Sequence, residues 1–172
     1  FIIEADQNDS TRWFTNSWSK FRLTDIGSVS VYNNTQLADA YWDSTTYSLK
    51  PLSDNTTIDL HAQLQMFNDT NSTKNVGART IHEKLDGTKE VIDQDGFGIS
   101  GSILSDPSES YTPNISVTLR VGEQIYFEGK TDTSTSNVVR QEISGDGNSS
   151  NSTWVKVSRI SSEVIGMTAL LR

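Results

Sequence analysis

The clearest pattern in the chain is a strict alternation of apolar and polar residues in the segment TIDLHAQLQMF, residues 57–67. Every second position is apolar: Ile58, Leu60, Ala62, Leu64 and Met66. Successive side chains of a β-strand point to opposite faces of its sheet. The period of two therefore predicts a long strand with one face on a core and the other toward water or a second surface.

A second clean alternation covers residues 115–121, and shorter strand-like runs occur along most of the chain. These runs lie at 20–26, 28–32, 41–49, 76–85, 97–104, 124–128, 137–143 and 153–160. Tracts rich in Ser, Thr, Asn and Gly lie between them, at 68–75, 105–113, 131–137 and 144–153. Turn signals about every 8–12 residues are typical of antiparallel sandwiches. We therefore predict an all-β antiparallel sandwich of about ten strands.

The two ends of the chain differ from this pattern. We place the sandwich domain at residues 18–160, and residues 1–17 are either a first strand or an arm that packs on a neighbour. Residues 161–172 form a C-terminal extension, in which apolar residues recur at steps of three and four. That spacing predicts a short amphipathic helix over 162–171.

Composition and charge narrow the range of partners. Hydrophobic residues are only 34 % of the chain and alanine is scarce, which favours strands and loops over helices. The net charge of −8 repels phosphates, so neither nucleic acid nor an anionic membrane is an expected partner. No apolar run approaches the roughly 20 residues that span a bilayer, and we expect no membrane insertion. With no cysteine, the chain has neither disulfides nor thiolate metal sites.

The sequence carries no catalytic motif. His61 lies on the polar face of the 57–67 strand, and His82 stands beside Glu83 in TIHEKLD, but no two-histidine metal spacing is present. The segments 93–96 and 146–150 resemble the start of a calcium loop but lack the closing glutamate, so we interpret them as turns. We expect no catalytic residue, no cofactor and no bound metal, and hence a protein that is not an enzyme.

Eight asparagines begin Asn-x-Ser/Thr triplets, where about three would be expected by chance. They are Asn8, Asn33, Asn55, Asn68, Asn71, Asn114, Asn148 and Asn151. Either the chain is glycosylated on a eukaryotic secretory route, or its polar loops simply concentrate these residues. Among the tryptophans, we expect Trp42 and Trp154 to pack in the core.

Several segments, taken in order, resemble a known family. They are YWDSTTYSLKPL at 41–52, TIDLHAQLQM at 57–66, ISVTLRVGEQIYF at 115–127 and TWVKVSRI at 153–160. This succession resembles tumour-necrosis-factor-like and complement-globular-head jelly rolls. The resemblance implies a ten-stranded jelly roll that forms a homotrimer about a threefold axis. Phage tail fibres, spikes and capsid-decoration proteins also use such trimers, and the acidity and lack of cysteine fit a phage protein better than a cytokine.

The resemblance leads us to expect a non-enzymatic viral protein on the virion surface, outside the cell. It would attach to a host-surface ligand, such as a carbohydrate, through polar loop tips, and trimeric avidity would supply strength. The candidate ligand-contact residues are Asn68, Asn71, Asp132, Asn137, Asp146 and Asn148.

Two alternatives stay open. The chain could be a capsid-decoration (cement) protein that binds other virion proteins, anchored by residues 1–3 or 164–171. It could also be a secreted eukaryotic lectin-like glycoprotein, if the Asn-x-Ser/Thr triplets are modified.

Overall fold

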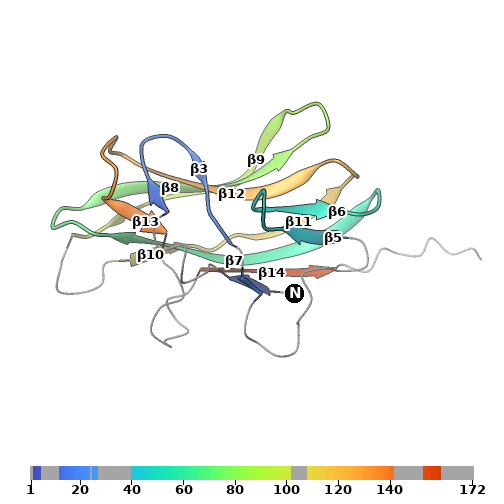
Figure 1. Ribbon diagram of the computed structural model, residues 1–172, viewed down its shortest axis with the longest axis horizontal. Helices are drawn as coiled ribbons and strands as arrows, with labels where there is room; N and C mark the ends of the chain where they lie inside the picture. Colours follow the sequence, from blue (N-terminus) through green and yellow to red (C-terminus); the bar gives the residue numbers. More distant parts are fainter. Residues whose placement is uncertain are drawn as a thin grey trace, which may run out of the picture.

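The computed structural model describes residues 2–4, 12–23, 25–26, 40–101, 108–141 and 153–159. This part of the chain is all-β, as predicted, and its described residues include no helix (Figure 1). It has fourteen strands where about ten were predicted, and three of the fourteen are only two residues long. The helix predicted for 162–171 lies outside the described residues. Among the residues that the structure describes, no helix is long and apolar enough to cross a membrane. The strands are β1 (Ile2–Glu4), β2 (Trp13–Phe14), β3 (Ser19–Lys20), β4 (Asp25–Ile26), β5 (Ala40–Asp43), β6 (Ser48–Pro51), β7 (Thr56–Asn68), β8 (Lys74–Glu83), β9 (Lys89–Ile99), β10 (Ser108–Tyr111), β11 (Asn114–Leu119), β12 (Gln124–Thr131), β13 (Val139–Gln141) and β14 (Trp154–Arg159).

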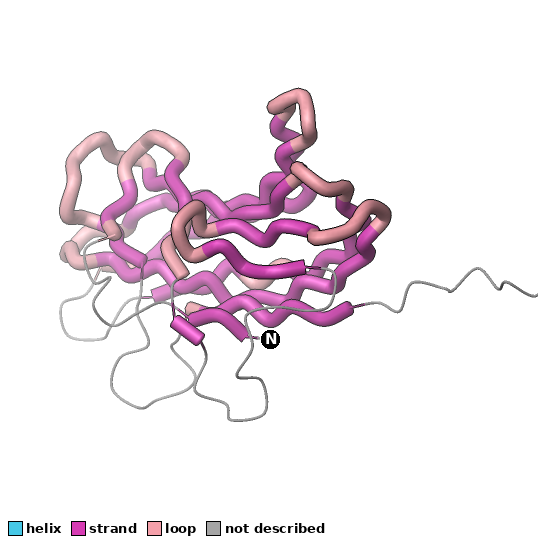
Figure 2. The backbone as a smooth tube through the Cα atoms, turned by 45° about the vertical axis from the view of Figure 1, so that its right-hand side comes forward, coloured by secondary structure: helices cyan, strands magenta, loops and turns pink. Residues whose placement is uncertain are grey.

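The strands form two sheets that pack face to face (Figures 1 and 2). One sheet has eight strands in the order β2-β13-β7-β14-β1-β4, with β10 and β11 also paired to β7. The other has six strands in the order β5-β6-β12-β8-β9, with β3 paired to β12. Every described strand pair is antiparallel, which is the arrangement expected of a jelly-roll sandwich.

Strand β7 organises the eight-stranded sheet. It bonds β11 and β10 along one edge and β14 and β13 along the other. The five apolar side chains predicted to share a face, Ile58 to Met66, are all fully buried. Because a slip of one residue would turn all five toward water, this burial fixes the register of β7 against its four neighbours.

The core fills the space between the sheets. From the six-stranded side, Ile125 and Phe127 of β12 face β7. Phe14 of β2, in the eight-stranded sheet, packs on Phe21 with ring centroids 4.9 Å apart. Trp42 is buried as predicted, and its indole nitrogen donates to the Leu23 carbonyl over 2.9 Å. Burial of its indole N–H is possible because that hydrogen bond satisfies it.

The segment 1–17 contributes two described strands. The backbone of β1 pairs with β14 on one side and β4 on the other, and Phe14 of β2 is fully buried. Both strands belong to the same sheet as β7.

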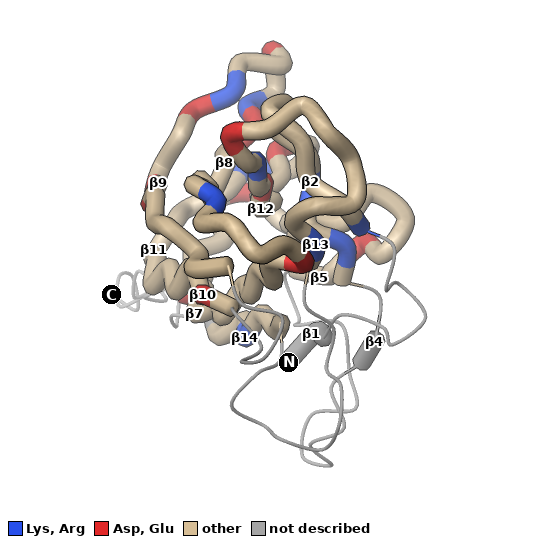
Figure 3. Tube along the Cα trace, turned by 90° about the vertical axis from the view of Figure 1, so that its left-hand side faces the viewer, with Lys and Arg blue, Asp and Glu red and all other residues tan. Residues whose placement is uncertain are grey.

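The antiparallel pairing gives the sandwich two distinct ends. At the turn end, the connections 52–55, 84–88 and 120–123 lie together, because β7 and β12 begin there and β8 ends there. At the loop end, the connections 69–73 and 132–138 lie together. In Figure 1 the turn end is on the right and the loop end on the left. Figure 3 looks onto the loop end and shows acidic and basic residues interspersed on it.

Candidate functional site

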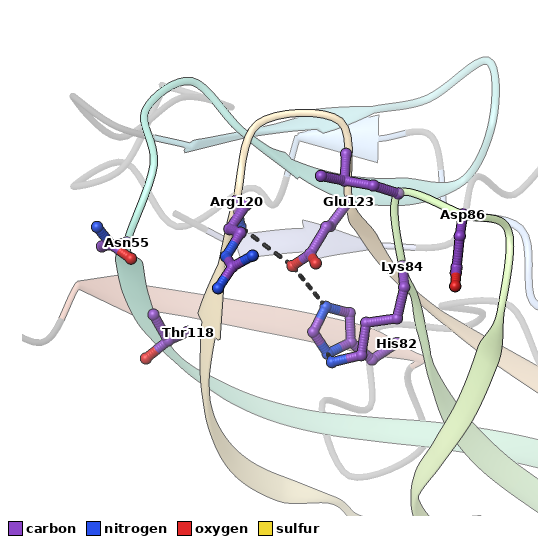
Figure 4. Close-up of a pocket in the computed structure, with 8 residues that line it drawn as sticks. Asn55, His82, Lys84, Asp86, Thr118, Arg120 and Glu123 are labelled. Carbon is purple, nitrogen blue, oxygen red and sulfur yellow. Dashed lines mark hydrogen bonds and ion pairs between the residues drawn. The ribbon is translucent and has the colours of Figure 1, made fainter.

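An open pocket of about 560 Å³ lies at the turn end, where three connections meet. Its size falls within the range of about 300–1,000 Å³ that is usual for small-molecule sites. Eight residues line it: Asn55, His82, Lys84, Leu85, Asp86, Thr118, Arg120 and Glu123 (Figure 4). They come from the β6–β7 turn, the end of β8, the β8–β9 turn, β11 and the β11–β12 turn.

His82 forms the buried floor of this pocket. On β8 it shares a face with Val76, Ala78 and Thr80, all of which are buried toward the sandwich interior. The alternation of the strand therefore carries the imidazole inward, and only 3 % of His82 is exposed. Because His82 occupies the last inward position of β8, its ring contacts residues of the neighbouring turns, such as Lys84 and Glu123, instead of the apolar core.

A chain of three polar groups runs through His82. The Nε2 atom lies 2.9 Å from Oε2 of Glu123, and Nδ1 lies 2.9 Å from Nζ of Lys84. A lysine ammonium can only donate, so Nδ1 must accept, and the ring proton must sit on Nε2 and be donated to Glu123. The hydrogen-bond partners thus assign a neutral imidazole held between a cation and an anion.

Glu123 is held as a carboxylate although it is almost buried. Burial works against the charged form, but hydrogen bonds from the Arg120 N–H, at 3.1 Å, and from His82 outweigh it. The positive charge of Lys84 adds to this effect, and the pKa of Glu123 lies below its ordinary value. Lys84 is anchored on its other side by Glu90, at 3.1 Å.

The other side of the pocket is formed by Arg120, Thr118 and Asn55 (Figure 4). The Thr118 hydroxyl pairs with Thr57 over 2.8 Å, and Asn55 adopts a left-handed backbone with φ of 58°. Arg120 is exposed, and its guanidinium has no ion-pair or hydrogen-bond partner among the described residues. The pocket therefore presents a free cation at its rim.

Within the described part of the chain, the pocket has the parts of a binding site and no nucleophile paired with a base. The hydroxyl that lines it, on Thr118, bonds to Thr57 and makes no bond to His82 there. In the same described residues, no group of three His, Asp or Glu side chains could hold a metal ion.

Residues predicted to contact a ligand gather at the loop end. The carboxylate of Asp132 accepts the Asn75 N–H at 3.1 Å and its Nδ2–H at 3.0 Å, which ties the loop 132–138 to the start of β8. The loops 69–73 and 132–138 are joined by the hydrogen bond that the Asp69 N–H donates to the Val138 carbonyl over 2.9 Å. Asn71, Asp132 and Asn137 are exposed, so the structure brings these three onto one end of the molecule. Asp146 and Asn148 lie outside the described residues.

Asn68 plays a different part from the one predicted. It is only 1 % exposed, and its amide donates to the carbonyls of Ser72 and Ile99 at 2.9 and 3.1 Å. Its side-chain oxygen accepts the N–H and hydroxyl of Thr70. The side chain of Asn68 therefore makes its hydrogen bonds within the protein and fixes the shape of the loop, and it is not exposed for contact with a ligand.

The outer face of the eight-stranded sheet, which is turned away from the core, carries an aromatic pair. Trp154 was predicted to be in the core, but it is half-buried on the outer face of β14, where its ring contacts His61 with ring centroids 5.3 Å apart and a tilt of 37°. The reason is strand parity: Val155 and Val157 take the inward positions and are buried, which turns Trp154 outward.

Comparison with known proteins identifies the fold. No protein-family model matches the chain, and no curated protein does. Among solved structures, the chain is similar to the Eiger TNF of S. frugiperda, with 7 % identity and a TM-score of 0.57. The likeness covers 99 % of this chain and 96 % of that one. This chain has a TNF-like jelly-roll fold. The jelly-roll fold that the sequence resemblance implied is thereby confirmed. At 7 % identity the structural likeness shows the fold alone.

Proposed function

We propose that the chain forms a homotrimer on a virion surface and attaches to a host-surface ligand through the loop end. The observation that carries the proposal is the presentation of Asn71, Asp132 and Asn137 on one end of a rigid sandwich. Loops on a rigid scaffold can vary for recognition without loss of the core. The hydrogen bond from the Asp69 N–H to the Val138 carbonyl joins the two loops and preorganises them, which lowers the entropy cost of binding.

A homotrimer is supported by the fold and by the outer face of the eight-stranded sheet, which is the face turned away from the core. Its outer side carries Phe67, Trp154 and His61 among polar residues. Aromatic side chains with polar neighbours are typical of subunit interfaces. Three copies of a weak polar site would then act together, and avidity would supply the attachment strength.

The ligand class that fits the loop end best is carbohydrate. The exposed side chains there are amides, hydroxyls and carboxylates, which hydrogen-bond sugar hydroxyls in a wet interface. Attachment of the purified protein to host cells, or to an array of surface glycans, tests the proposal directly.

Two asparagines with the same backbone conformation give a matched pair of variants. Asn137 lies at the loop end with φ of 65°, and Asn55 lies at the turn end with φ of 58°. Glycine tolerates both conformations, so Asn137→Gly and Asn55→Gly each remove a side chain with little backbone strain. We expect attachment to weaken in Asn137→Gly and to persist in Asn55→Gly. The reverse pattern would place the ligand at the turn end and contradict the proposal.

A secreted eukaryotic glycoprotein is the second candidate, and exposed Asn-x-Ser/Thr triplets favour it. Asn55, Asn71 and Asn114 are exposed, so a glycan could be attached without disturbing the core. Asn68 is buried and fully bonded, so it should be unmodified in either case. Mass spectrometry of the native protein separates the candidates: glycans on the exposed sites support the second, and bare asparagines support the first.

The capsid-decoration alternative receives less support. One of its two expected anchors, residues 1–3, overlaps β1, whose backbone is paired on both sides within the sheet. The other anchor, residues 164–171, lies outside the described residues. Virion binding by a chain that lacks this segment is the test: binding unchanged by its removal would count against the alternative.

A further inference from the structure

We infer that the turn-end pocket is a binding site for a small ligand that bears one carboxylate on a hydroxylated ring, such as an acidic monosaccharide. This goes beyond the proposed function, because it places a second ligand site at the opposite end of β7, β8 and β12 from the exposed loops. It depends neither on the trimer nor on the virion setting.

The first step is the free cation. In a chain with a net charge of −8, the described basic side chains near the pocket are Arg120 and Lys84. Lys84 is bonded to His82 and Glu90, whereas the guanidinium of Arg120 has no partner in the described residues. A planar guanidinium at the rim of a pocket matches the two oxygens of a carboxylate, which it can bind with two parallel hydrogen bonds.

The second step is the charge that the pocket can accept. Glu123 points to His82 and is satisfied there by the ring N–H and by the Arg120 N–H (Figure 4). Asp86 lines the opposite side, and Glu90 shares the charge of Lys84. With one free cation and these carboxylates nearby, the pocket favours a singly charged ligand over a doubly charged phosphate.

The third step is the rest of the lining. Thr118 and Asn55 offer hydroxyl and amide groups on the Arg120 side, and Leu85, which is 60 % exposed, offers an apolar edge. A ring with hydroxyl groups on one side of its carboxylate and C–H groups on the other suits this mixture. The neutral His82, fixed between Lys84 and Glu123, gives the pocket a rigid floor.

The test is a titration of the full chain with four probes. Binding is monitored by calorimetry and by the NMR signals of the Arg120 and His82 side chains. The probes are methyl glucuronide, its neutral methyl ester, methyl glucoside and inorganic phosphate. We expect only the carboxylate to bind at millimolar concentrations and to shift the Arg120 side-chain signal. Equal binding of the ester or glucoside, equal binding of phosphate, or no binding of the glucuronide would each overturn the inference.

The variant Arg120→Gln removes the free cation, and because that side chain is exposed we expect the fold and its thermal midpoint to be retained. Glucuronide binding should weaken at least about tenfold, as expected for loss of one charge-assisted pair. The control is Lys74→Gln, which removes the same charge at the other end of β8. Undiminished binding in Arg120→Gln, or an equal loss in Lys74→Gln, would contradict the inference. Neither result bears on attachment through the loop end, so the two proposals fail separately.

Discussion

Nε2 of His82 donates to Oε2 of Glu123 across 2.9 Å, at a point where β8 ends and β12 is about to begin. The two residues are 41 positions apart in the sequence, and both are almost fully buried. The pair joins two strands of the six-stranded sheet through side chains at the place where their backbone ladder finishes.

Removal of Glu123 should destabilise the protein markedly. Glu123→Ala leaves the His82 ring N–H and the Arg120 N–H without their acceptor in a buried place. We expect the free energy of unfolding to fall by about 2–4 kcal/mol, measured by urea denaturation. Glu109→Ala, an exposed glutamate on β10, is the control and should change it by less than about 0.5 kcal/mol. Equal effects of the two substitutions would show that the buried pair adds no stability.

Stability should decrease in acid. The pKa of Asp43 is lowered by the hydrogen bond from Lys50 Nζ at 2.6 Å, and the pKa values of Asp132 and Glu123 are also lowered. A carboxyl whose pKa is lower in the folded state adds stability above its unfolded pKa of about 4, and this stability is lost as the pH falls through the folded value. The unfolding free energy should therefore change little between about pH 7 and pH 5 on account of these groups, and should decline below about pH 4.5.

Asp43→Asn isolates one share of this acid dependence, because it removes a titrating group but keeps a hydrogen-bonding side chain. Chemical denaturation at a series of pH values should give a shallower decline in this variant than in the unmodified chain. Parallel curves for the two proteins would mean that the Asp43–Lys50 pair is not linked to folding.

Asn68, at the end of β7, and Asn71, in the loop 69–73, should differ in their contribution to stability. Asn68→Ala removes hydrogen bonds to Ser72, Ile99 and Thr70 in a buried position, and it should cost about 1–3 kcal/mol in urea denaturation. Asn71→Ala changes an exposed side chain and should be nearly neutral for stability. A stable Asn68→Ala variant would show that the loop keeps its shape without the buried amide.

An added methyl group at Gly129 should destabilise the sandwich. It lies on the inward face of β12, where a Cβ atom would overlap Met66 and come 2.8 Å from a ring carbon of Phe14. Gly129→Ala should therefore destabilise the sandwich by about 1–3 kcal/mol through overpacking. The control is Gly96→Ala on β9, where the nearest atom to the added carbon is 3.6 Å away. The thermal midpoints of the two variants check this prediction. Equal midpoints would mean that the core relaxes around the added carbon atom.

The fold could be predicted from the sequence because its signal is local. The alternation of residues 57–67 appears as β7, Thr56–Asn68, with the predicted side chains inward, and the 115–121 alternation appears as β11, Asn114–Leu119. Strand parity is a property of neighbouring residues, so no knowledge of the partner strands was needed. Trp154 shows the limit of that reasoning, because its size suggested the core while Val155 and Val157 occupied the inward positions.

The candidate site could be predicted only in part. His82 follows Val76, Ala78 and Thr80 at the inward positions of β8, and that parity was the signal that could have placed it inside. Its pairing with Glu123 depends on which strands become neighbours, and no spacing in the sequence carries that information. The same holds for Asn68. The composition of the tract 68–75 predicts a loop, but Asn68 is buried because its amide bonds to the carbonyls of residues 99 and 100, far along the chain.

The native mass of the protein in solution tests the central claim most directly, since attachment through three joined loop ends requires three chains. Sedimentation equilibrium or light scattering at micromolar concentration should give three times the chain mass of 19.1 kDa. Variants in which Trp154 or His61 is replaced on the outer face of the eight-stranded sheet should shift that mass toward a single chain. A particle with the mass of one chain at every accessible concentration would contradict the account.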